Sequence, residues 1–247
     1  MPDHDFNAQR LCVSDDLSEG ALVALAPEQA HYAANVIRLA VGADILLFNG
    51  RDGEWRARRV AAGKRDVKLE VLAQTRPQPS ALTVEYAFAP LKHARLDYMI
   101  QKAVEMGAGI LSPVVTRYTQ VSRVNLERMT ANAVEAAEQC GILTLPQVSP
   151  PRSLTQWLAE LPADRVLAFC DEAAEEGDPV AALRRAPPGP VSVLVGPEGG
   201  FAPEERAMLA PRAVILSLGP RILRADTAAV AALALVEAAR SGAGPAR

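Results

Sequence analysis

The chain has 247 residues, of which 49% are hydrophobic and 22% charged, an ordinary composition for a globular protein. This length allows one large domain or two unequal ones. A net charge of −3 argues against a protein that coats nucleic acid indiscriminately. The longest apolar run, residues 228–236, is shorter than the roughly 20 residues that cross a bilayer, and the polar N-terminus lacks a signal-peptide core. We therefore expect a cytoplasmic protein without a membrane segment.

The cysteines and histidines do not indicate a metal site. Three residues of each type are scattered along the chain without close spacing: Cys12, Cys140, Cys170, His4, His31 and His93. This pattern favours reduced core thiols over a disulfide framework or a zinc site.

Charge is distributed unevenly along the sequence. Residues 51–68 hold seven basic and three acidic side chains, whereas residues 160–178 hold seven acidic side chains and only Arg165 as a base. Taken alone, either cluster is most simply interpreted as a solvated face. The basic cluster also suits RNA phosphates, provided that other features indicate an RNA substrate.

Residues 1–73 are predicted to form a small β-barrel domain. Short apolar or alternating strands are expected at 10–13, 21–25, 44–50, 54–60 and 66–73, with tight turns at Asn49-Gly50 and Asp52-Gly53. One helix is expected at 26–32, because Pro27 suits the first helical position. Short strands of this kind close most naturally into a barrel. Two prolines in the following segment, 74–81, predict a linker.

Residues 82–247 alternate between apolar strands and amphipathic helices. Strands are expected at 82–89, 110–115, 166–170, 191–196 and 214–219, and helices at about 94–106, 125–140, 180–185, 203–210 and 227–240. Such alternation predicts an α/β domain in which helices cover both faces of a mostly parallel sheet.

Two strand-to-turn junctions carry candidate chemistry. In the first, the strand at 193–195 runs into Gly196-Pro197-Glu198-Gly199-Gly200-Phe201, which permits close approach of a ligand to the backbone. Ligands bind at the carboxyl ends of strands in open α/β sheets. A phosphate-binding loop would carry a lysine where Glu198 stands, so an uncharged or cationic ligand is favoured.

The second junction is Leu218-Gly219-Pro220-Arg221-Ile222-Leu223-Arg224-Ala225-Asp226-Thr227, again a strand, a Gly-Pro turn and a helix. Taken alone, Asp226 could be the N-cap of the last helix and Arg224 a surface charge. Because two similar turns follow consecutive strands, the strand ends could instead hold one ligand between them.

The two junctions together resemble the paired signature of SPOUT methyltransferases, specifically the 16S ribosomal RNA uridine-N3 methyltransferases. Further segments resemble that family over almost the whole chain: 10–13, 31–42, 47–55, 100–107 and 135–141. The resemblance implies a PUA-like N-terminal domain at 1–73 and a SPOUT methyltransferase domain with a deep trefoil knot at 82–247. It also implies S-adenosylmethionine as cofactor, 16S rRNA of the small ribosomal subunit as substrate, and a homodimer.

Position by position, the resemblance assigns a cofactor site largely to backbone groups at the two turns, with a wall at the end of strand 166–170. The implied cofactor residues are Phe169, Cys170, Leu194, Gly196, Glu198, Gly199, Gly200, Leu218, Gly219, Ile222, Leu223 and Thr227. The chain departs from the family pattern in two places. Asp226 stands where many members have glutamate, and Ile142 stands where an arginine often follows the glycine.

Methylation of uridine N3 requires loss of the imide proton and leaves negative charge on the flanking carbonyl oxygens. Arg224 is the expected catalytic residue, because its fixed fork of donors suits a delocalised oxyanion. Asp226 is a second candidate, as proton acceptor, and no metal is needed. The expected RNA contacts are basic side chains from both domains: Arg38, Arg51, Arg56, Arg58, Lys92, Arg95, Lys102 and Arg117.

Two other functions stay open at this point. One is a noncatalytic RNA-binding or ribosome-assembly protein that retains the fold, which intact Arg224 and both glycine turns argue against. The other is a nucleotide-binding α/β enzyme, which the missing lysine in the first turn argues against. For assembly, the last helix is apolar around most of its circumference, which predicts burial on several sides and a place in a dimer interface.

Overall fold

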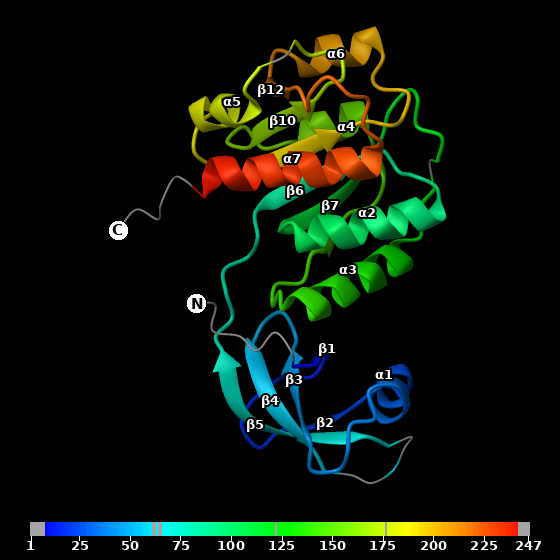
Figure 1. Cartoon of the computed structure of the whole chain (residues 1–247), viewed down its shortest axis with the longest axis vertical. Coiled ribbons are helices and arrows are strands. Elements are labelled where there is room, and N and C mark those ends of the chain that lie inside the picture. The colour runs from blue at the N-terminus through cyan, green and yellow to red at the C-terminus, as the bar shows by residue number, and fades with distance from the viewer. Residues whose placement is uncertain (1–7, 61–62, 64–65, 122, 176, 242–247) are drawn as a thin grey trace. The chain divides into compact units, whose positions relative to one another are not determined.

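The computed structural model describes residues 8–60, 63, 66–121, 123–175 and 177–241 (Figure 1). It contains two compact units: unit 1 comprises Met1–Ala81 with Val134–Leu145, and unit 2 comprises Leu82–Ala133 with Pro146–Arg247. The sequence prediction had placed residues 134–145 in the C-terminal domain. Two residues of the basic cluster, Lys64 and Arg65, lie outside the described residues. So do residues 1–7 of the predicted N-terminal domain and residues 242–247 of the predicted C-terminal domain.

Unit 1 is built on a curled five-stranded sheet of order β1-β3-β4-β5-β2 (Figure 1). Its strands are β1 (Arg10–Cys12), β2 (Leu22–Ala24), β3 (Asp44–Phe48), β4 (Glu54–Arg59) and β5 (Lys68–Arg76). Among the described strands of this sheet, the β1–β3 pair is parallel and the other pairs are antiparallel. Among the described residues β1 and β2 do not pair, so the expected barrel is not closed by hydrogen bonds.

Two elements of unit 1 extend beyond their predicted bounds. Strand β5 continues to Arg76 because Gln74 and Arg76 pair with β4, so the segment at 74–76 is strand and not linker. Helix α1 (Pro27–His31) continues into a π-helical turn, Tyr32–Val36. The chain then leaves this turn through Arg38, whose φ of 52° is unusual for a residue with a side chain.

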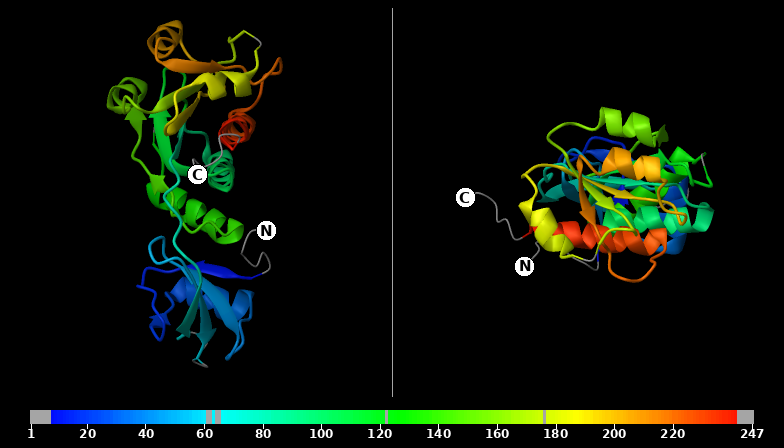
Figure 2. Two further views of the ribbon diagram at one scale, coloured as in Figure 1. Left: turned by 90° about the vertical axis from the view of Figure 1, so that its left-hand side faces the viewer. Right: turned by 90° about the horizontal axis from the view of Figure 1, so that it is seen from above.

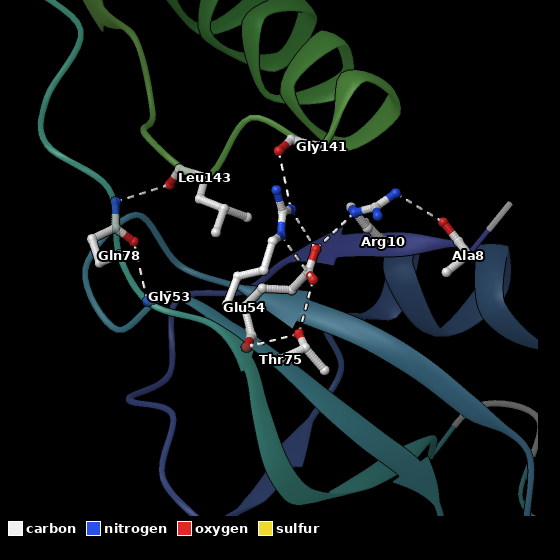
Figure 3. A network of polar contacts seen from close by, with 9 residues as sticks. Ala8, Arg10, Gly53, Glu54, Thr75, Gln78, Gly141 and Leu143 are labelled. Carbon is white, nitrogen blue, oxygen red and sulfur yellow. Dashed lines mark hydrogen bonds and ion pairs between the residues drawn. The ribbon is translucent and has the colours of Figure 1, made fainter. Parts of the chain in front are cut away.

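A buried carboxylate organises one end of unit 1 (Figure 3). The side chain of Glu54 is 2% exposed and accepts hydrogen bonds from Arg10 Nε at 2.8 Å and Arg76 Nη2 at 2.6 Å. Thr75 Oγ1 donates to the same carboxylate at 2.8 Å. Arg76 also donates to the Gly141 carbonyl at 3.0 Å, which ties residues 134–145 to the sheet.

Unit 2 contains an all-parallel sheet of order β12-β10-β11-β6-β7-β8, with β9 paired to β7. Its strands are β6 (Val84–Phe88), β7 (Ala108–Val115), β8 (Gln147–Val148), β9 (Arg152–Ser153), β10 (Val166–Cys170), β11 (Val191–Val195) and β12 (Ala213–Leu216). Its helices are α2 (His93–Glu105), α4 (Leu154–Glu160), α5 (Pro179–Arg185), α6 (Pro203–Leu209) and α7 (Ala225–Arg240), and α3 (Leu126–Cys140) begins in this unit.

Helices cover both faces of this sheet, as the strand–helix alternation predicts (Figures 1 and 2). Helices α2 and α7 pack side by side over one face. On the other face, Trp157 of α4 and Leu209 of α6 join Phe169 of β10 in one apolar core. Successive residues along each strand point to opposite faces of the sheet and so pack against different helices.

A second buried carboxylate crosslinks the strands of unit 2. Glu85 of β6 accepts hydrogen bonds from Ser112 Oγ at 2.6 Å and Trp157 Nε1 at 3.0 Å, and another from Ser192 Oγ. These donors come from β7, α4 and β11, so one side chain joins the central strands to the helix that covers them.

Helix α4 and the short strands β8 and β9 were not predicted. The signal for α4 was present: Ser153 Oγ accepts from the Gln156 backbone N–H at 3.2 Å, while Gln156 Oε1 accepts from the Ser153 backbone N–H at 3.2 Å. This reciprocal pair is a capping box, and the pattern Ser-x-x-Gln marks it in the sequence.

The last helix begins two residues earlier than expected, at Ala225. Its N-cap is Arg224, so the interpretation of Asp226 as N-cap is wrong. One face, which includes Ala228, Ala232 and Val236, is buried within the unit. Among the described residues, no helix is long and apolar enough to span a membrane.

The Glu54 cluster predicts a pH-dependent stability. Burial raises the pKa of Glu54, but the hydrogen bonds from Arg76, Arg10 and Thr75 outweigh it and leave the pKa below its ordinary value. The stabilisation is therefore complete above the unfolded pKa of about 4.3 and is lost as the pH falls through the lower folded value.

We expect Glu54→Gln to lower the free energy of unfolding by about 3–5 kcal/mol at pH 7, because two arginines lose their buried partner. The difference in unfolding free energy between the variant and the wild type should become smaller in acid. Urea denaturation at a series of pH values measures this difference. Glu70→Gln, the same change on the adjoining strand at a half-buried site, should cost less than about 1 kcal/mol. Equal losses for both variants would contradict a special role for Glu54.

Candidate functional site

The loops that follow β10, β11 and β12 enclose a pocket of about 560 Å³, here named the glycine-loop pocket. These strands are neighbours in one parallel sheet, so their carboxyl ends lie together, where α/β folds bind ligands. Its lining comprises three segments: Cys170, Asp171, Glu172 and Ala174; residues 195–200; and residues 217–223 with Ala225 and Ala228. The two junctions identified in the sequence therefore contribute to one site.

Two glycines of the first junction have no room for a side chain. A Cβ at Gly196 would overlap the ring of Phe201, which packs edge-on against Phe169 at a centroid distance of 4.8 Å. Gly200 has a φ of 67°, and a Cβ there would meet the Glu172 carboxylate. At both positions the loop backbone lies close to a protein side chain, which a residue with a Cβ would displace.

Acidic side chains contribute to the lining of the glycine-loop pocket. Asp171 is 9% exposed and accepts from Arg206 Nε at 3.0 Å, while Glu172 accepts from Arg206 Nη2 at 2.5 Å. Glu198 lies in the lining as well, so the pocket presents three carboxylates. It suits a ligand that carries hydroxyl groups or positive charge.

The acidic cluster at 160–178 is largely exposed, as its interpretation as a solvated face predicts, and among its described acidic side chains Asp171 alone is buried. Asp171 and Glu172 contribute to a pocket, Glu160 pairs with Arg152 at 2.6 Å, and Asp178 caps helix α5. The sequence signal that could have placed Asp171 and Glu172 in a pocket is their position directly after the buried strand β10.

Most of the predicted cofactor residues meet in this pocket. Nine of them line it: Cys170, Gly196, Glu198, Gly199, Gly200, Leu218, Gly219, Ile222 and Leu223. Phe169 and Leu194 instead point into the apolar core, because they alternate with Cys170 and Val195 along their strands. Thr227 is exposed and is absent from the lining.

The cysteines differ more than the sequence suggested. Burial raises the pKa of Cys170 to about 12, so it stays a neutral thiol in the pocket wall. Burial, helped by the charge of Glu138, raises the pKa of Cys12 to about 11. Cys140 is exposed, so the expectation of three core thiols is wrong for it.

The two predicted catalytic residues flank the pocket without lining it. Arg224 is exposed, although its neighbours Leu223 and Ala225 contribute to the lining. The Asp226 carboxylate accepts from the Thr227 backbone N–H at 2.8 Å. Burial, with a smaller contribution from the negative charge of Asp226, raises the pKa of Tyr86 well above its ordinary value.

The predicted RNA contacts of unit 1 are exposed but partly engaged. Arg58 makes a two-pronged ion pair with Asp44, at 2.7 and 3.1 Å, and Arg56 Nε lies 3.9 Å from the same carboxylate. Arg51 pairs with Asp16 at 2.7 Å. Arg38 is exposed at the strained position after the π-helical turn. Such surface pairs exchange partners at little cost.

Of the four RNA contacts predicted in unit 2, two line a second pocket and two lie outside the pocket linings. Lys92 and Arg95 line a pocket beside the glycine-loop pocket, and Arg95 pairs with Glu198. Arg117 is exposed on the loop after β7. Lys102 pairs with Glu105 and lies 5.6 Å from the centre of the Tyr98 ring, outside both pocket linings.

No group of three or more histidine, cysteine, aspartate or glutamate side chains within the described part of the chain is arranged to hold a metal ion.

Comparison with known proteins shows which family the chain resembles. Residues 78–237 match the family described as RNA methyltransferase domain, and residues 25–72 match the RNA methyltransferase PUA domain. Ribosomal RNA small subunit methyltransferase E of Rickettsia conorii is 31% identical over 92% of this chain and 94% of its own length. The Synechocystis protein of the same name is 32% identical over 94% of this chain and 78% of its own length.

Solved structures agree in fold. A ribosomal RNA small subunit methyltransferase E from Neisseria gonorrhoeae, bound to S-adenosylmethionine, superposes with a TM-score of 0.83 and 29% identity over 94% of this chain and 98% of that one. A methyltransferase from Legionella pneumophila, in complex with the same cofactor, gives a TM-score of 0.84 and 28% identity over the same shares of both chains.

We expect Gly196→Ala to destabilise the protein by about 1–3 kcal/mol, because the new methyl group overlaps Phe201 in a packed core. Gly177→Ala is the matched control, since a Cβ there meets nothing within 4 Å, and it should change stability by less than about 0.5 kcal/mol. Thermal unfolding of both variants measures the difference. A Gly196→Ala protein as stable as the control would show that the junction tolerates a side chain.

Proposed function

The chain belongs to the RNA methyltransferase family, and we propose that it transfers a methyl group from S-adenosylmethionine to N3 of a specific uridine in 16S ribosomal RNA. The observation that carries the proposal is the glycine-loop pocket, which joins both signature junctions at the carboxyl end of the sheet. The uridine position and the assembled small subunit as substrate come from the family resemblance, as does a place in the cytoplasm.

The residues of the glycine-loop pocket fit S-adenosylmethionine. Its volume of about 560 Å³ lies within the usual range for small-molecule sites. Asp171, Glu172 and Glu198 offer carboxylates to ribose hydroxyl groups and to the positive charges of the cofactor. Leu218 and Leu223 supply an apolar surface suited to adenine. When bound, the cofactor provides a methyl group on a positively charged sulfur, so a metal is not required to activate it.

The chain's own task is to hold the uracil and stabilise it as it loses a proton. A bond forms between N3 and the methyl carbon as the sulfur–carbon bond breaks, and the N3 proton leaves to an acceptor. Arg224 donates hydrogen bonds to the carbonyl oxygens on which negative charge develops. Its exposed position beside the pocket leaves its guanidinium available to the substrate. Asp226, two residues further on, is the candidate proton acceptor.

RNA affinity comes from exposed arginines and lysines of both units. Arg38, Arg51, Arg56 and Arg58 serve in unit 1, and Lys92, Arg95, Lys102 and Arg117 in unit 2. Phosphates replace the acidic partners of these side chains when RNA binds, and released counterions supply the driving force. Ile142 stands where the family pattern has a further arginine, so this chain has one candidate contact fewer.

The direct test incubates methyl-labelled S-adenosylmethionine with small ribosomal subunits that lack the modification, followed by mapping of the labelled nucleotide. The proposal predicts label at N3 of a single uridine of 16S rRNA. Label at another atom, or none, would contradict it.

Arg224→Ala should lower methyl transfer by roughly 100–1000-fold while cofactor affinity stays within a few-fold, because one donor to a developing oxyanion is lost. Rate measurements with saturating cofactor and calorimetric titration separate the two quantities. Arg185→Ala, at an exposed arginine at the end of α5 and outside the pocket lining, is the control. Unchanged turnover in Arg224→Ala would remove this residue from the mechanism.

The proposal includes a homodimer and the deep trefoil knot of the SPOUT family. Helix α7 supports the dimer, since Ala231, Ala234 and Leu235 line a groove with residues 217–220 instead of lying in the core. Ile222 in the neighbouring turn is 97% exposed, as a partner-facing side chain would be in an isolated chain. Ala232, in contrast, is fully buried within unit 2, so substitution there would disrupt the subunit itself.

Leu235→Glu should convert the dimer to a monomer and weaken S-adenosylmethionine binding at least tenfold, because the pocket borders the proposed interface. Leu22→Glu, the same change at a 67% exposed side chain on β2 of unit 1, should leave both properties unchanged. Native mass spectrometry and calorimetry give the two readouts. A wild-type protein that is monomeric at micromolar concentration would rule out the dimer.

A further inference from the structure

A second pocket, of about 440 Å³, lies beside the glycine-loop pocket and is here named the Tyr118 pocket. Its lining comes from the loops after β6, β7 and β11, with the first turn of α2: Pro90, Leu91, Lys92, Ala94, Arg95, Tyr118, Gln120, Val121, Pro197 and Glu198. The two pockets share Pro197 and Glu198. Because β11 stands between β10 and β6 in the sheet, its loop separates two adjoining sites at one carboxyl end.

Tyr118 offers an aromatic surface held in a fixed position. Its side chain is 47% exposed at the pocket, although only 4% of the chain's residues are aromatic. Hydrogen bonds between Thr116 and Thr119 close the turn that carries it, the Thr116 backbone N–H donating to Thr119 Oγ1 at 2.8 Å. A Cβ at Gly199 would come within 3.2 Å of Tyr118 Cβ, so the tyrosine also lies against the glycine loop.

Glu205 fixes the same turn from helix α6. One of its oxygens accepts from the Arg117 backbone N–H at 2.8 Å, and the other from the Ala202 backbone N–H at 2.9 Å. Glu205 is 8% exposed, so this bridge is largely shielded from water. The Tyr118 turn is therefore tied to the segment that follows the glycine loop, which links the geometry of the two pockets.

Positive charge borders the Tyr118 pocket on the side of α2. Lys92 is exposed at the N-cap of this helix, and Arg95 pairs with Glu198 at the boundary between the pockets. Both partners of that ion pair are more than 40% exposed, so the pair is weak and exchangeable. An incoming phosphate can take Arg95 and leave the Glu198 carboxylate facing the glycine-loop pocket.

We propose that the Tyr118 pocket receives the target pyrimidine nucleotide of the RNA, with its base stacked on Tyr118 and its phosphates on Lys92 and Arg95. This inference rests on the proposed methyl transfer. A base turned out of its stack needs an aromatic or apolar face in a pocket, and every base offers a π-face to a tyrosine ring. The position beside the glycine-loop pocket places the base next to the proposed cofactor.

Gln120 supplies a polar group to the same pocket. Its side chain is exposed, and its amide makes no side-chain hydrogen bond within the described part of the chain. The amide N–H groups can donate to a carbonyl oxygen next to the reacting nitrogen. Gln120 thus acts on the same oxygens as Arg224 and makes the pocket suited to a uracil.

The first test compares tyrosine variants in methyl transfer at limiting RNA. Tyr118→Ala should lower kcat/KM by about 10–100-fold, the usual effect of removing one stacking surface, and Tyr118→Phe should stay within about threefold. Alanine keeps the Cβ that meets Gly199, so S-adenosylmethionine affinity should not change. Tyr32→Ala is the matched control, because Tyr32 is 37% exposed in unit 1 and outside the lining. Equal losses for Tyr118→Ala and Tyr32→Ala would overturn the assignment.

The second test locates the base directly. RNA carrying 4-thiouridine at the nucleotide that the wild-type protein methylates is irradiated in the complex, and the crosslinked peptide is mapped. Crosslinks within residues 90–95 or 118–121 support the Tyr118 pocket. Crosslinks elsewhere, with methyl transfer by the wild-type protein intact, overturn this inference and leave the proposed function standing. A wild-type protein that methylates no RNA overturns both.

Discussion

The parallel arrangement of β12, β10, β11, β6 and β7 is the constraint on which the site depends. Parallel strands direct all their carboxyl ends the same way, so five loops from distant parts of the sequence meet at one end of the sheet. Glu85 helps to hold this order, because its buried carboxylate takes donors from both neighbouring strands. The pockets are consequences of strand order, and the loop after β11 serves both.

The sequence predicted the framework of this arrangement well. Continuous apolar strands alternating with amphipathic helices indicated a covered parallel sheet, and the Gly-Pro turns marked two of the loops that form the glycine-loop pocket. Nine of the twelve predicted cofactor residues line it, because glycines and turn residues mark places where a ligand can approach the backbone closely. Phe169 and Leu194 do not line the pocket, because successive residues of a strand point to opposite faces of the sheet. Their neighbours Cys170 and Val195 line the pocket, whereas Phe169 and Leu194 lie in the core.

What could not be predicted depends on long-range partners. The contribution of Asp171 and Glu172 requires knowing that β10 lies between β12 and β11, which no local pattern states. Tyr118 lies in a loop whose position depends on Glu205, a residue far along the chain. Residues 134–145 join unit 1 through the Arg76–Gly141 hydrogen bond, so the helix that the sequence placed in one domain contributes to both units.

Hydrogen–deuterium exchange with and without S-adenosylmethionine tests most directly whether the carboxyl end of the sheet is the functional site. We predict that the cofactor alone slows exchange in residues 170–174, 195–200 and 217–225. Residues 90–95 and 118–121 should gain protection only when substrate RNA is added. Unchanged exchange in the three glycine-loop segments, or protection concentrated elsewhere in the chain, would contradict it.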